Sequence, residues 1–251
     1  TERHILAVQQ ILERNQAGYR KLPGTELKNQ RTGEVVYRPP QDAPLIMSLM
    51  SNLEHYINDD ELSDVDPLVK MAVIHFQFES IHPFYDGNGR TGRIINILYL
   101  VLKDLLKLPV LYLSRYVIQH KDDYYRLLQD VRDNNNWEAW ILFMLEAIEQ
   151  TSRQTVSLIQ KIRELMQLTK HRLRDKLEKI YSQDLINNMF CHPYTKIDFL
   201  QQELDISRQT ASKYLEKLVE AGFLKKEKIG RSNYYINEPL LEILLSVSRN
   251  D

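Results

Sequence analysis

Apolar residues recur at spacings of three and four along most of this chain of 251 residues, and this period predicts a mainly helical protein. The few glycines and prolines cluster at the joints between the periodic segments. In the first part of the chain we expect helices at 4–15, 44–57, 67–79, 91–106, 115–133 and 136–150. Residues 16–44 are predicted to form a loop with a hairpin, because the β-prone run 34–37 follows a Thr32-Gly33 turn.

The helix predicted at 91–106 is apolar nearly all round, so we expect it to be the central buried element. A glycine-rich segment directly before it would then be fixed to the most rigid part of the domain. In the helix at 67–79, the apolar stripe is expected to face the core, with His75 as a buried, hydrogen-bonded histidine.

From about Tyr181 the pattern changes to shorter elements. We expect short helices at 184–190, from Thr195, and from Ser207 to Ala221, then β-prone runs at 223–226 and 234–236. This order looks like a winged helix-turn-helix. We therefore predict three parts: a domain at 1–152, a connecting helix at 153–180 and a winged-helix domain at 181–251.

Composition describes a soluble globular protein, with 43% hydrophobic and 27% charged residues and a formal net charge of −1. No apolar run approaches the length of a membrane-spanning helix, so no membrane partner is expected. The single cysteine, Cys191, excludes an internal disulfide and favours a reducing, cytoplasmic location. Because the sequence does not start with methionine, we expect it to begin inside a longer natural chain.

Most of the candidate chemistry lies in one stretch, Ile81-His82-Pro83-Phe84-Tyr85-Asp86-Gly87-Asn88-Gly89-Arg90-Thr91-Gly92-Arg93. Gly87 and Gly89 let successive backbone N–H groups point into one concavity, which favours a phosphate. The helix that follows adds its own unpaired N–H groups and its positive dipole end. Arg90 and Arg93 lie three residues apart on one side of that helix, so both can reach further phosphate oxygens.

Two other side chains in this stretch suit catalysis. His82 can take a proton near neutral pH, and Asp86 can hold a magnesium ion. The plain alternative is a surface turn with a helix cap, but such a turn needs one glycine and no histidine.

This stretch resembles the signature of the Fic family, His-Pro-Phe-x-Asp-Gly-Asn-Gly-Arg-x-x-Arg, and meets every specified position. Residues 20–24 and 32–40 are similar to the segment in which the family carries its target-positioning flap, and 122–125 and 137–140 also have counterparts. The resemblance covers about the first 150 residues. It implies a mainly α fold class, a Fic-type helical bundle with a small β-hairpin flap, followed here by the C-terminal winged-helix domain.

In the family the usual reaction moves AMP from ATP onto a hydroxyl of a target protein and releases pyrophosphate. The resemblance therefore implies a protein adenylyltransferase that uses ATP and Mg²⁺, with His82 as general base and Asp86 as the magnesium ligand. Asn88 would orient the α-phosphate, and Arg93 would reach the γ-phosphate. The expected nucleotide contacts in the motif are Gly87, Asn88, Gly89, Arg90, Thr91, Gly92 and Arg93.

The remaining nucleotide contacts are also placed by resemblance. Gln119, Tyr124 and Tyr125 are expected near the adenosine, where an aromatic face can stack on the base, although one tyrosine can equally pack in the core. The flap, residues 27–37, would pair its edge with an extended target peptide and hold the target hydroxyl. At its root, Leu27, Lys28, Asn29 and Gln30 are further candidates for nucleotide contact.

One expected element is missing from the sequence. Many Fic proteins restrain themselves with a helix of pattern Ser/Thr-x-x-x-Glu-Gly/Asn, whose glutamate pairs with the second motif arginine. Nothing here fits that pattern, so we expect the element upstream of Thr1 or on a partner.

The predicted winged helix has a modest basic face. DNA-contact candidates are Arg208, Gln209, Ser212, Lys213 and Arg231. With few phosphate contacts, DNA affinity would be low unless the protein forms a homodimer. A protein-contact or dimerisation module is the alternative reading.

Rival functions remain open at this point. The chain can be a DNA-binding regulator whose Fic domain senses nucleotide, or a Fic enzyme that removes AMP or moves another phosphate-linked group. The intact His82 and Asp86 favour an enzyme, since a sensor needs the phosphate cradle but not the base.

Overall fold

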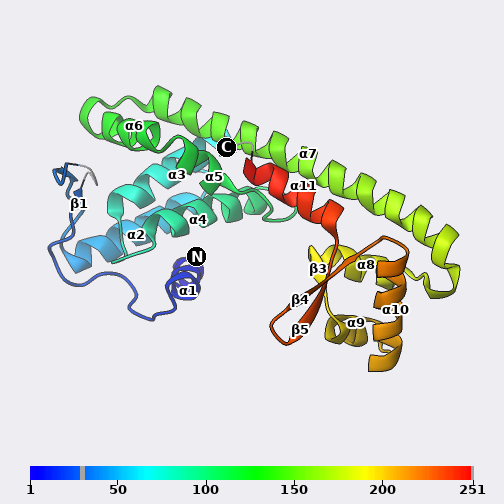
Figure 1. The fold of residues 1–251 in the computed structure, drawn as a ribbon. Helices are drawn as coiled ribbons and strands as arrows, with labels where there is room; N and C mark the ends of the chain where they lie inside the picture. The colour runs from blue at the N-terminus through cyan, green and yellow to red at the C-terminus, as the bar shows by residue number, and fades with distance from the viewer. Residues whose placement is uncertain (29–31, 250–251) are drawn as a thin grey trace. The chain divides into compact units, whose positions relative to one another are not determined.

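The structure is a computed structural model that describes residues 1–28 and 32–249, without the side chains of 247–249. The chain divides into two compact units, Thr1–Ser152 and Arg153–Asp251, here called the N-terminal and C-terminal units. Both are mainly helical, as predicted, with small antiparallel sheets (Figure 1). Among the described residues, no helix combines the length and the apolar character needed to cross a lipid bilayer.

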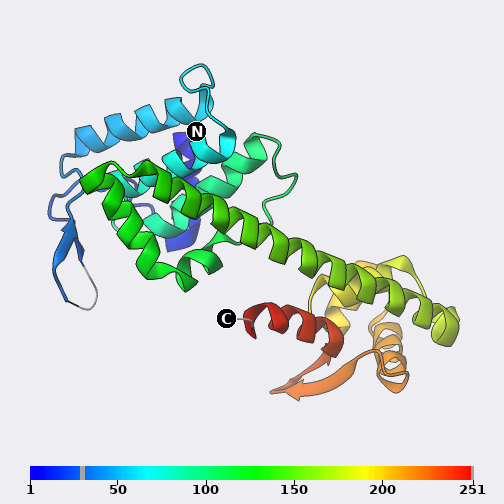
Figure 2. The same ribbon diagram turned by 90° about the horizontal axis from the view of Figure 1, so that it is seen from above.

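The N-terminal unit is a helical bundle with one hairpin. Its elements are α1 (Glu2–Glu13), β1 (Leu27–Lys28), β2 (Val35–Tyr37), α2 (Ala43–Asn58), α3 (Pro67–Ile81), α4 (Asn88–Leu102), α5 (Leu113–Gln119), α6 (Lys121–Asn134) and the first part of α7 (Trp137–Leu177). Helix α3 packs against α2 and α4, and α1 also contacts α4. The hairpin β1–β2 projects from the helices (Figure 2), with Leu27 paired to Tyr37.

Helices α3 and α4 share the central position that we expected for the second of them alone. On α3 even Lys70, His75 and Glu79 are buried, whereas on α4 the side chains of Leu98 and Leu102 are exposed. The elements packed against α4 therefore cover only part of its apolar surface. The prediction that His75 is buried and hydrogen-bonded is confirmed: its Nε2 lies 2.9 Å from the hydroxyl of Tyr124.

Two predicted helix boundaries were wrong. The helix expected at 115–133 is broken at His120, whose non-helical backbone ends α5 and starts α6 and whose Nδ1 lies 2.9 Å from the Tyr116 carbonyl oxygen. Conversely, one helix, α7, covers nearly all of the stretches expected at 136–150 and 153–180; it ends at Leu177, and a short 3₁₀ helix follows at Glu178–Ile180. Thr151 and Ser152 lie at the expected break, and neither glycine nor proline interrupts the chain there.

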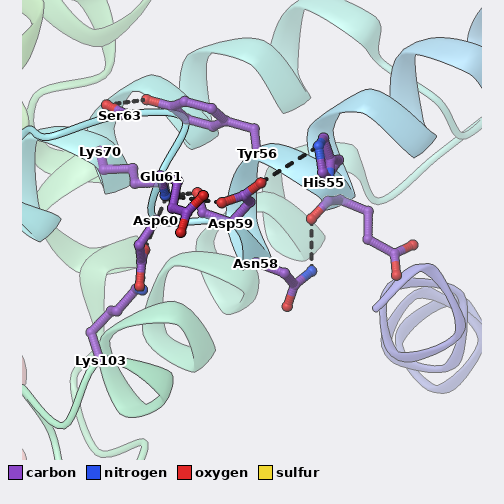
Figure 3. Close-up of polar contacts among 10 residues, drawn as sticks. His55, Tyr56, Asn58, Asp59, Asp60, Glu61, Ser63, Lys70 and Lys103 are labelled. Carbon is purple, nitrogen blue, oxygen red and sulfur yellow. Dashed lines mark hydrogen bonds and ion pairs between the residues drawn. The ribbon is translucent and has the colours of Figure 1, made fainter.

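The loop between α2 and α3 is fixed by two lysines that share one carboxylate (Figure 3). Lys103 at the end of α4 approaches Asp60 at 2.5 Å, and the buried Lys70 approaches it at 3.2 Å. These hydrogen bonds, with that of Lys103 the strongest, hold the pKa of Asp60 below its ordinary value. Lys70 also donates to the carbonyl of Asp59 at 2.9 Å, so its buried charge is satisfied.

The C-terminal unit contains the rest of α7 and a compact set of short elements. They are η1 (Glu178–Ile180), α8 (Gln183–Cys191), β3 (Tyr194–Thr195), α9 (Ile197–Leu204), α10 (Arg208–Glu220), β4 (Lys225–Ile229), β5 (Ser232–Ile236) and α11 (Glu238–Arg249). The antiparallel sheet has the order β3-β5-β4. Ser207 caps α10 by accepting from the Thr210 N–H, and Gly222 after it has φ 73°. Thr195, predicted to open a helix, instead lies in β3.

We expect Trp140→Phe to destabilise the N-terminal unit by roughly 2–3 kcal/mol. Trp140 is fully buried and donates from Nε1 to the Ala72 carbonyl at 2.9 Å, so the change leaves a void and removes a buried hydrogen bond. Urea unfolding followed by far-UV circular dichroism measures the loss. Trp137→Phe is the matched control, because Trp137 donates only to the exposed Asn135 side chain, and it should cost less than half as much. Equal costs would contradict this account.

Candidate functional site

The end of α3 and the start of α4 present the motif residues. Helix α3 ends at Ile81, and His82 caps it in the left-handed conformation, with φ 49°, while its N–H donates to the Phe78 carbonyl at 2.9 Å. Gly87, with φ 78°, directly precedes α4. The sequence folds this way because Pro83 cannot continue a helix and glycine accepts a positive φ at the turn.

The loop between the two helices is held from inside. Phe84 is fully buried. The side chain of Asn88 accepts from the Phe84 N–H at 2.9 Å and donates to the Phe84 carbonyl at 2.8 Å. In this arrangement Asn88 is 3% exposed and holds the loop, so its contact with an α-phosphate stays a prediction.

The first turn of α4 has bare backbone donors. Gly87 at the cap supplies no side-chain acceptor, and the first N–H with a helical partner is that of Thr91, which donates to the Gly87 carbonyl at 2.9 Å. The N–H groups of Asn88, Gly89 and Arg90 therefore have no acceptor among the described residues. Such a group of parallel N–H bonds at a helix N-terminus binds an anion.

Two predicted contacts, Thr91 and Gly92, lie on the buried side of this helix. Thr91 is fully buried. A Cβ added to Gly92 would lie 3.0 Å from Oε1 of Glu79 and 3.2 Å from His75, so Gly92 faces α3. Gly92 lets α4 approach α3, and the predicted contacts of both residues with a nucleotide stay predictions.

His82 is a neutral, partly covered base. Its side chain is 15% exposed, and burial lowers its pKa from the ordinary value of 6.5 to about 4. This differs from the unperturbed value that the sequence suggested, and the ring is therefore neutral at pH 7 and able to accept a proton. Nδ1 makes no hydrogen bond among the described residues.

Both motif arginines have partners in this structure. Arg90 forms an ion pair of 2.6 Å with Glu13, at the end of α1, and Arg93 donates from Nε to the Ser114 hydroxyl at 2.8 Å. Each guanidinium keeps further N–H groups, since arginine has five donors. Glu13 was missed by the sequence reasoning, because nothing local in α1 indicates that its last residue packs against the motif.

Glu79 is a second residue that the sequence reasoning missed. It is 7% exposed, its Oε1 has no hydrogen bond among the described residues, and its Oε2 lies 4.0 Å from Nδ1 of His82. Burial raises its pKa to about 7, against the opposing charges of Arg93 and Arg132. A signal was available, because a glutamate three residues before His82 falls on a helix whose residues are mostly apolar.

The residues expected near the adenosine differ in their exposure to solvent. Tyr124 is 2% exposed and bonded to His75, so it packs in the core, whereas Tyr125 is 56% exposed and keeps an aromatic face available for a base. Gln119 is the exposed last residue of α5.

At the flap, Lys28 is exposed and pairs with Glu26 at 3.2 Å, and Leu27 is partly buried. Asn29 and Gln30 lie outside the described residues.

The DNA-contact candidates of the C-terminal unit are exposed or partly exposed, but not all are available. Arg208 is held by Asp198 at 2.6 Å. Lys213 lines a groove of about 410 Å³ with Lys179, Lys217 and Gln209. Ser212 lies on the same helix, α10, and Arg231 lies in the turn between β4 and β5.

The motif offers one carboxylate, that of Asp86, as a candidate ligand for magnesium. The described residues contain no cluster of three or more His, Cys, Asp or Glu side chains arranged to hold a metal. Asp86 is exposed, and its Oδ1 accepts from the Gly87 N–H at 2.6 Å. One carboxylate beside a phosphate-binding turn suits Mg²⁺, which usually takes one or two carboxylates and completes its shell with substrate phosphates and water. The donor set therefore fits a magnesium ion that arrives with the nucleotide.

Two family models match the chain. Residues 1–100 match the Fic/DOC family, and residues 165–240 match the family described as protein adenylyltransferase SoFic-like, C-terminal domain.

Several curated proteins match part of this chain. The protein adenylyltransferase Fic of Drosophila grimshawi is 27% identical over 113 residues, which is 45% of this chain and 22% of that protein. The counterpart from Drosophila virilis is 40% identical over 57 residues, which is 23% of this chain and 12% of that protein. Protein adenylyltransferase fic-1 of Caenorhabditis briggsae is 27% identical over 96 residues, which is 38% of this chain and 19% of that protein. The matched segment thus spans only about a fifth or less of these relatives.

A solved structure shares the fold. A Fic family protein from Desulfovibrio desulfuricans G20 aligns with a TM-score of 0.55 and 22% identity, over 94% of this chain and 68% of that one. At this identity the likeness concerns the fold alone.

We expect Glu79→Gln to stabilise the protein at pH 8 by on the order of 3 kcal/mol, and the gain to shrink as the pH falls from 7 to 4.5. A carboxyl with a raised pKa keeps its proton when folded but loses it when unfolded, so wild-type stability falls as the pH rises through this window. Urea unfolding of wild type and variant across the pH range measures the difference between their free energies of unfolding. The contributions of the buried histidines cancel in this difference, because both proteins contain them. Exposed Glu61→Gln is the control and should follow wild type. A gain that does not vary with pH would refute the raised pKa.

Proposed function

We propose that this chain, which carries a Fic/DOC domain followed by a SoFic-like C-terminal domain, is a protein adenylyltransferase. It would move AMP from ATP to a Ser, Thr or Tyr hydroxyl of a target protein and release pyrophosphate. The observation that supports this best is the set of unsatisfied N–H groups at the start of α4 with the neutral His82 directly before the same loop. Relatives named protein adenylyltransferase match part of the chain, and the residues that match the Fic/DOC family, 1–100, include the motif.

In the proposed reaction the target hydroxyl oxygen bonds to the α-phosphorus as the bond from that phosphorus to the β-phosphate oxygen breaks. His82 accepts the hydroxyl proton, and pyrophosphate leaves with the electron pair of the broken bond. The N–H groups of Asn88, Gly89 and Arg90 stabilise the negative charge on the phosphate oxygens. When bound at Asp86, Mg²⁺ would neutralise part of the charge on the leaving group.

The other parts have supporting roles in this proposal. Arg90 and Arg93 bind the outer phosphates with the N–H groups that Glu13 and Ser114 leave available. Tyr125 stacks on the adenine, and the exposed edge of the flap orders an extended target peptide. We assign catalysis to residues 1–152, connection to 153–180 and a winged-helix module to 181–251, and we place the protein in the cytoplasm because its only cysteine suits a reducing compartment.

We expect His82→Ala to lower AMP transfer by roughly 10²- to 10⁴-fold while leaving Mg-ATP affinity nearly unchanged, because the ring accepts a proton but holds no phosphate. Arg93→Ala should weaken Mg-ATP binding by about tenfold or more, because a phosphate loses a charged donor. Labelling from ATP that carries a radioactive α-phosphate measures transfer, and calorimetry measures affinity. His55→Ala, at an exposed histidine on α2, is the control and should resemble wild type. An equal loss of affinity in both active-site variants would contradict the assigned roles.

A second function, DNA binding by the C-terminal unit, is supported by the groove beside α10. Lys179, Lys213 and Lys217 line it, and none of them forms an ion pair among the described residues. By contrast Arg208 and Lys226 are neutralised by Asp198 and Glu216. We therefore propose that phosphate contacts come from the groove lysines and Arg231, with a homodimer providing enough of them for useful affinity.

We expect the full chain to bind a labelled duplex of mixed sequence at low salt. In Lys213→Gln with Lys217→Gln, the slope of log K against log salt should be shallower by about two, because each lysine neutralises one phosphate. Fluorescence anisotropy at several salt concentrations measures the slope. The double variant Lys107→Gln with Lys161→Gln removes two exposed lysines elsewhere and should keep the wild-type slope. An absence of binding at low salt would favour a protein-contact module.

A further inference from the structure

Arg20 is a buried cation without an acidic partner. It is 1% exposed, and burial lowers its pKa below the ordinary value. No carboxylate among the described residues pairs with it; it donates instead to backbone carbonyls. Burying an unpaired charge is costly unless its hydrogen bonds are made, so these carbonyls must stay in place for Arg20 to remain buried.

The carbonyls that Arg20 holds come from two places. Nε donates to the carbonyl of His82 at 2.8 Å, and Nη2 donates to that of Ile81 at 3.3 Å. Nη2 also donates to the carbonyl of Pro40, which follows the flap. In addition, the backbone N–H of Arg20, which precedes the flap, donates to the Pro83 carbonyl at 2.8 Å. One residue therefore joins both ends of the flap segment to the peptide that carries His82.

The His82 backbone needs this support. A non-glycine residue in the left-handed region is strained and keeps that conformation only when its surroundings fix it. The hydrogen bond from Arg20 to the His82 carbonyl fixes it from one side, and the Phe78 carbonyl accepts its N–H on the other.

Tyr85 provides a second link between the same two segments. Its hydroxyl oxygen accepts from the N–H groups of Lys21 at 2.9 Å and Leu22 at 3.1 Å, and these two bonds lower its pKa. The side chain is 51% exposed, so it can be altered without disturbing the core. We call Arg20 and Tyr85 together the clamp.

We propose that the clamp positions the flap relative to His82, so that a target hydroxyl held on the flap lies within reach of the imidazole and in line with the α-phosphorus. This inference rests on the proposed function. Arg20 and Tyr85 are positioning residues, since neither needs to touch the nucleotide or the target. A displacement of about 1 Å between reacting groups can cost a hundredfold in rate, so loosening the clamp should slow transfer without affecting nucleotide binding.

Arg20→Lys and Tyr85→Phe test the clamp separately. Lysine keeps the charge but loses the forked geometry that reaches carbonyls on two segments, and phenylalanine keeps the ring but loses the acceptor. Transfer to the total protein of a bacterial lysate is measured with ATP labelled at the α-phosphate, and Mg-ATP affinity is measured by calorimetry. Hydrogen exchange of the amides at 35–37 reports on the flap.

Each clamp variant should lower the transfer rate by about ten- to a hundredfold, leave Mg-ATP affinity within about twofold and speed amide exchange at 35–37. Arg163→Lys is the matched control for arginine, because Arg163 is an exposed residue of α7 in the C-terminal unit. Tyr194→Phe, in the C-terminal unit, removes a hydroxyl without a hydrogen bond among the described residues. Both controls should transfer at the wild-type rate.

Other results would overturn the clamp. Wild-type transfer in both variants would show that the links do not position anything, and a parallel loss of Mg-ATP affinity would show that they merely support the nucleotide site. Should Arg20→Lys fail to fold by circular dichroism, Tyr85→Phe decides alone. If wild type and His82→Ala label target proteins equally, the proposed function fails. The clamp is tested separately: amide exchange at 35–37 that is the same in the clamp variants as in wild type would refute it whatever the labelling shows.

Discussion

The candidate site depends on how closely the first turn of α4 lies against α3. That turn presents N–H groups without acceptors, because glycine at its cap offers no side chain and the helix begins there. The turn can occupy this position only because Gly92 has no Cβ, which would meet Glu79 and Phe78 at 3.0 Å. The loop that connects the two helices is then short, and Asn88 and Phe84 fix its course from inside. Every other feature of the site is arranged around this contact.

The polar groups buried beneath the turn keep its electric field favourable to an anion. Glu79 is close to the turn, but burial raises its pKa to about 7, which removes much of the negative charge that would oppose a phosphate near neutral pH. His75 and His82 are buried enough to be neutral, with pKa values lowered to about 3 and about 4. Arg93 supplies positive charge on the same side as the bare N–H groups. The low dielectric of the core therefore sets the protonation of Glu79, His75 and His82 in the sense that anion binding requires.

The sequence predicted the helices well where apolar period and capping residues agree, as in α3, where Asp66 and Pro67 start the helix, and α10, where Ser207 does. It failed where a boundary depends on tertiary contacts: the break at His120 and the continuity of α7 have no local signal. It also placed the motif residues but not their partners. Glu13 and Glu79 contribute because they pack against the motif, and a pattern read along the chain does not show which distant carboxylate will lie beside a given arginine.

The same limit explains why the anchoring of the flap was not predicted. A two-stranded hairpin is only marginally stable by itself, so the order of β1 and β2 must come from contacts at their base. Tyr37 at the end of β2 donates to the Ser80 carbonyl at 2.9 Å, and its ring lies 3.8 Å from the Arg132 guanidinium. Val35 and Val36, by contrast, are 40% and 49% exposed, so the outer part of the hairpin has an apolar surface without a partner. Since Ser80 and His82 belong to the same end of α3, the helix that presents the proposed base also fixes the surface proposed to hold the acceptor. A rigid common support of this kind is what a transfer between two separate substrates requires, because neither the nucleotide nor the target can correct the position of the other.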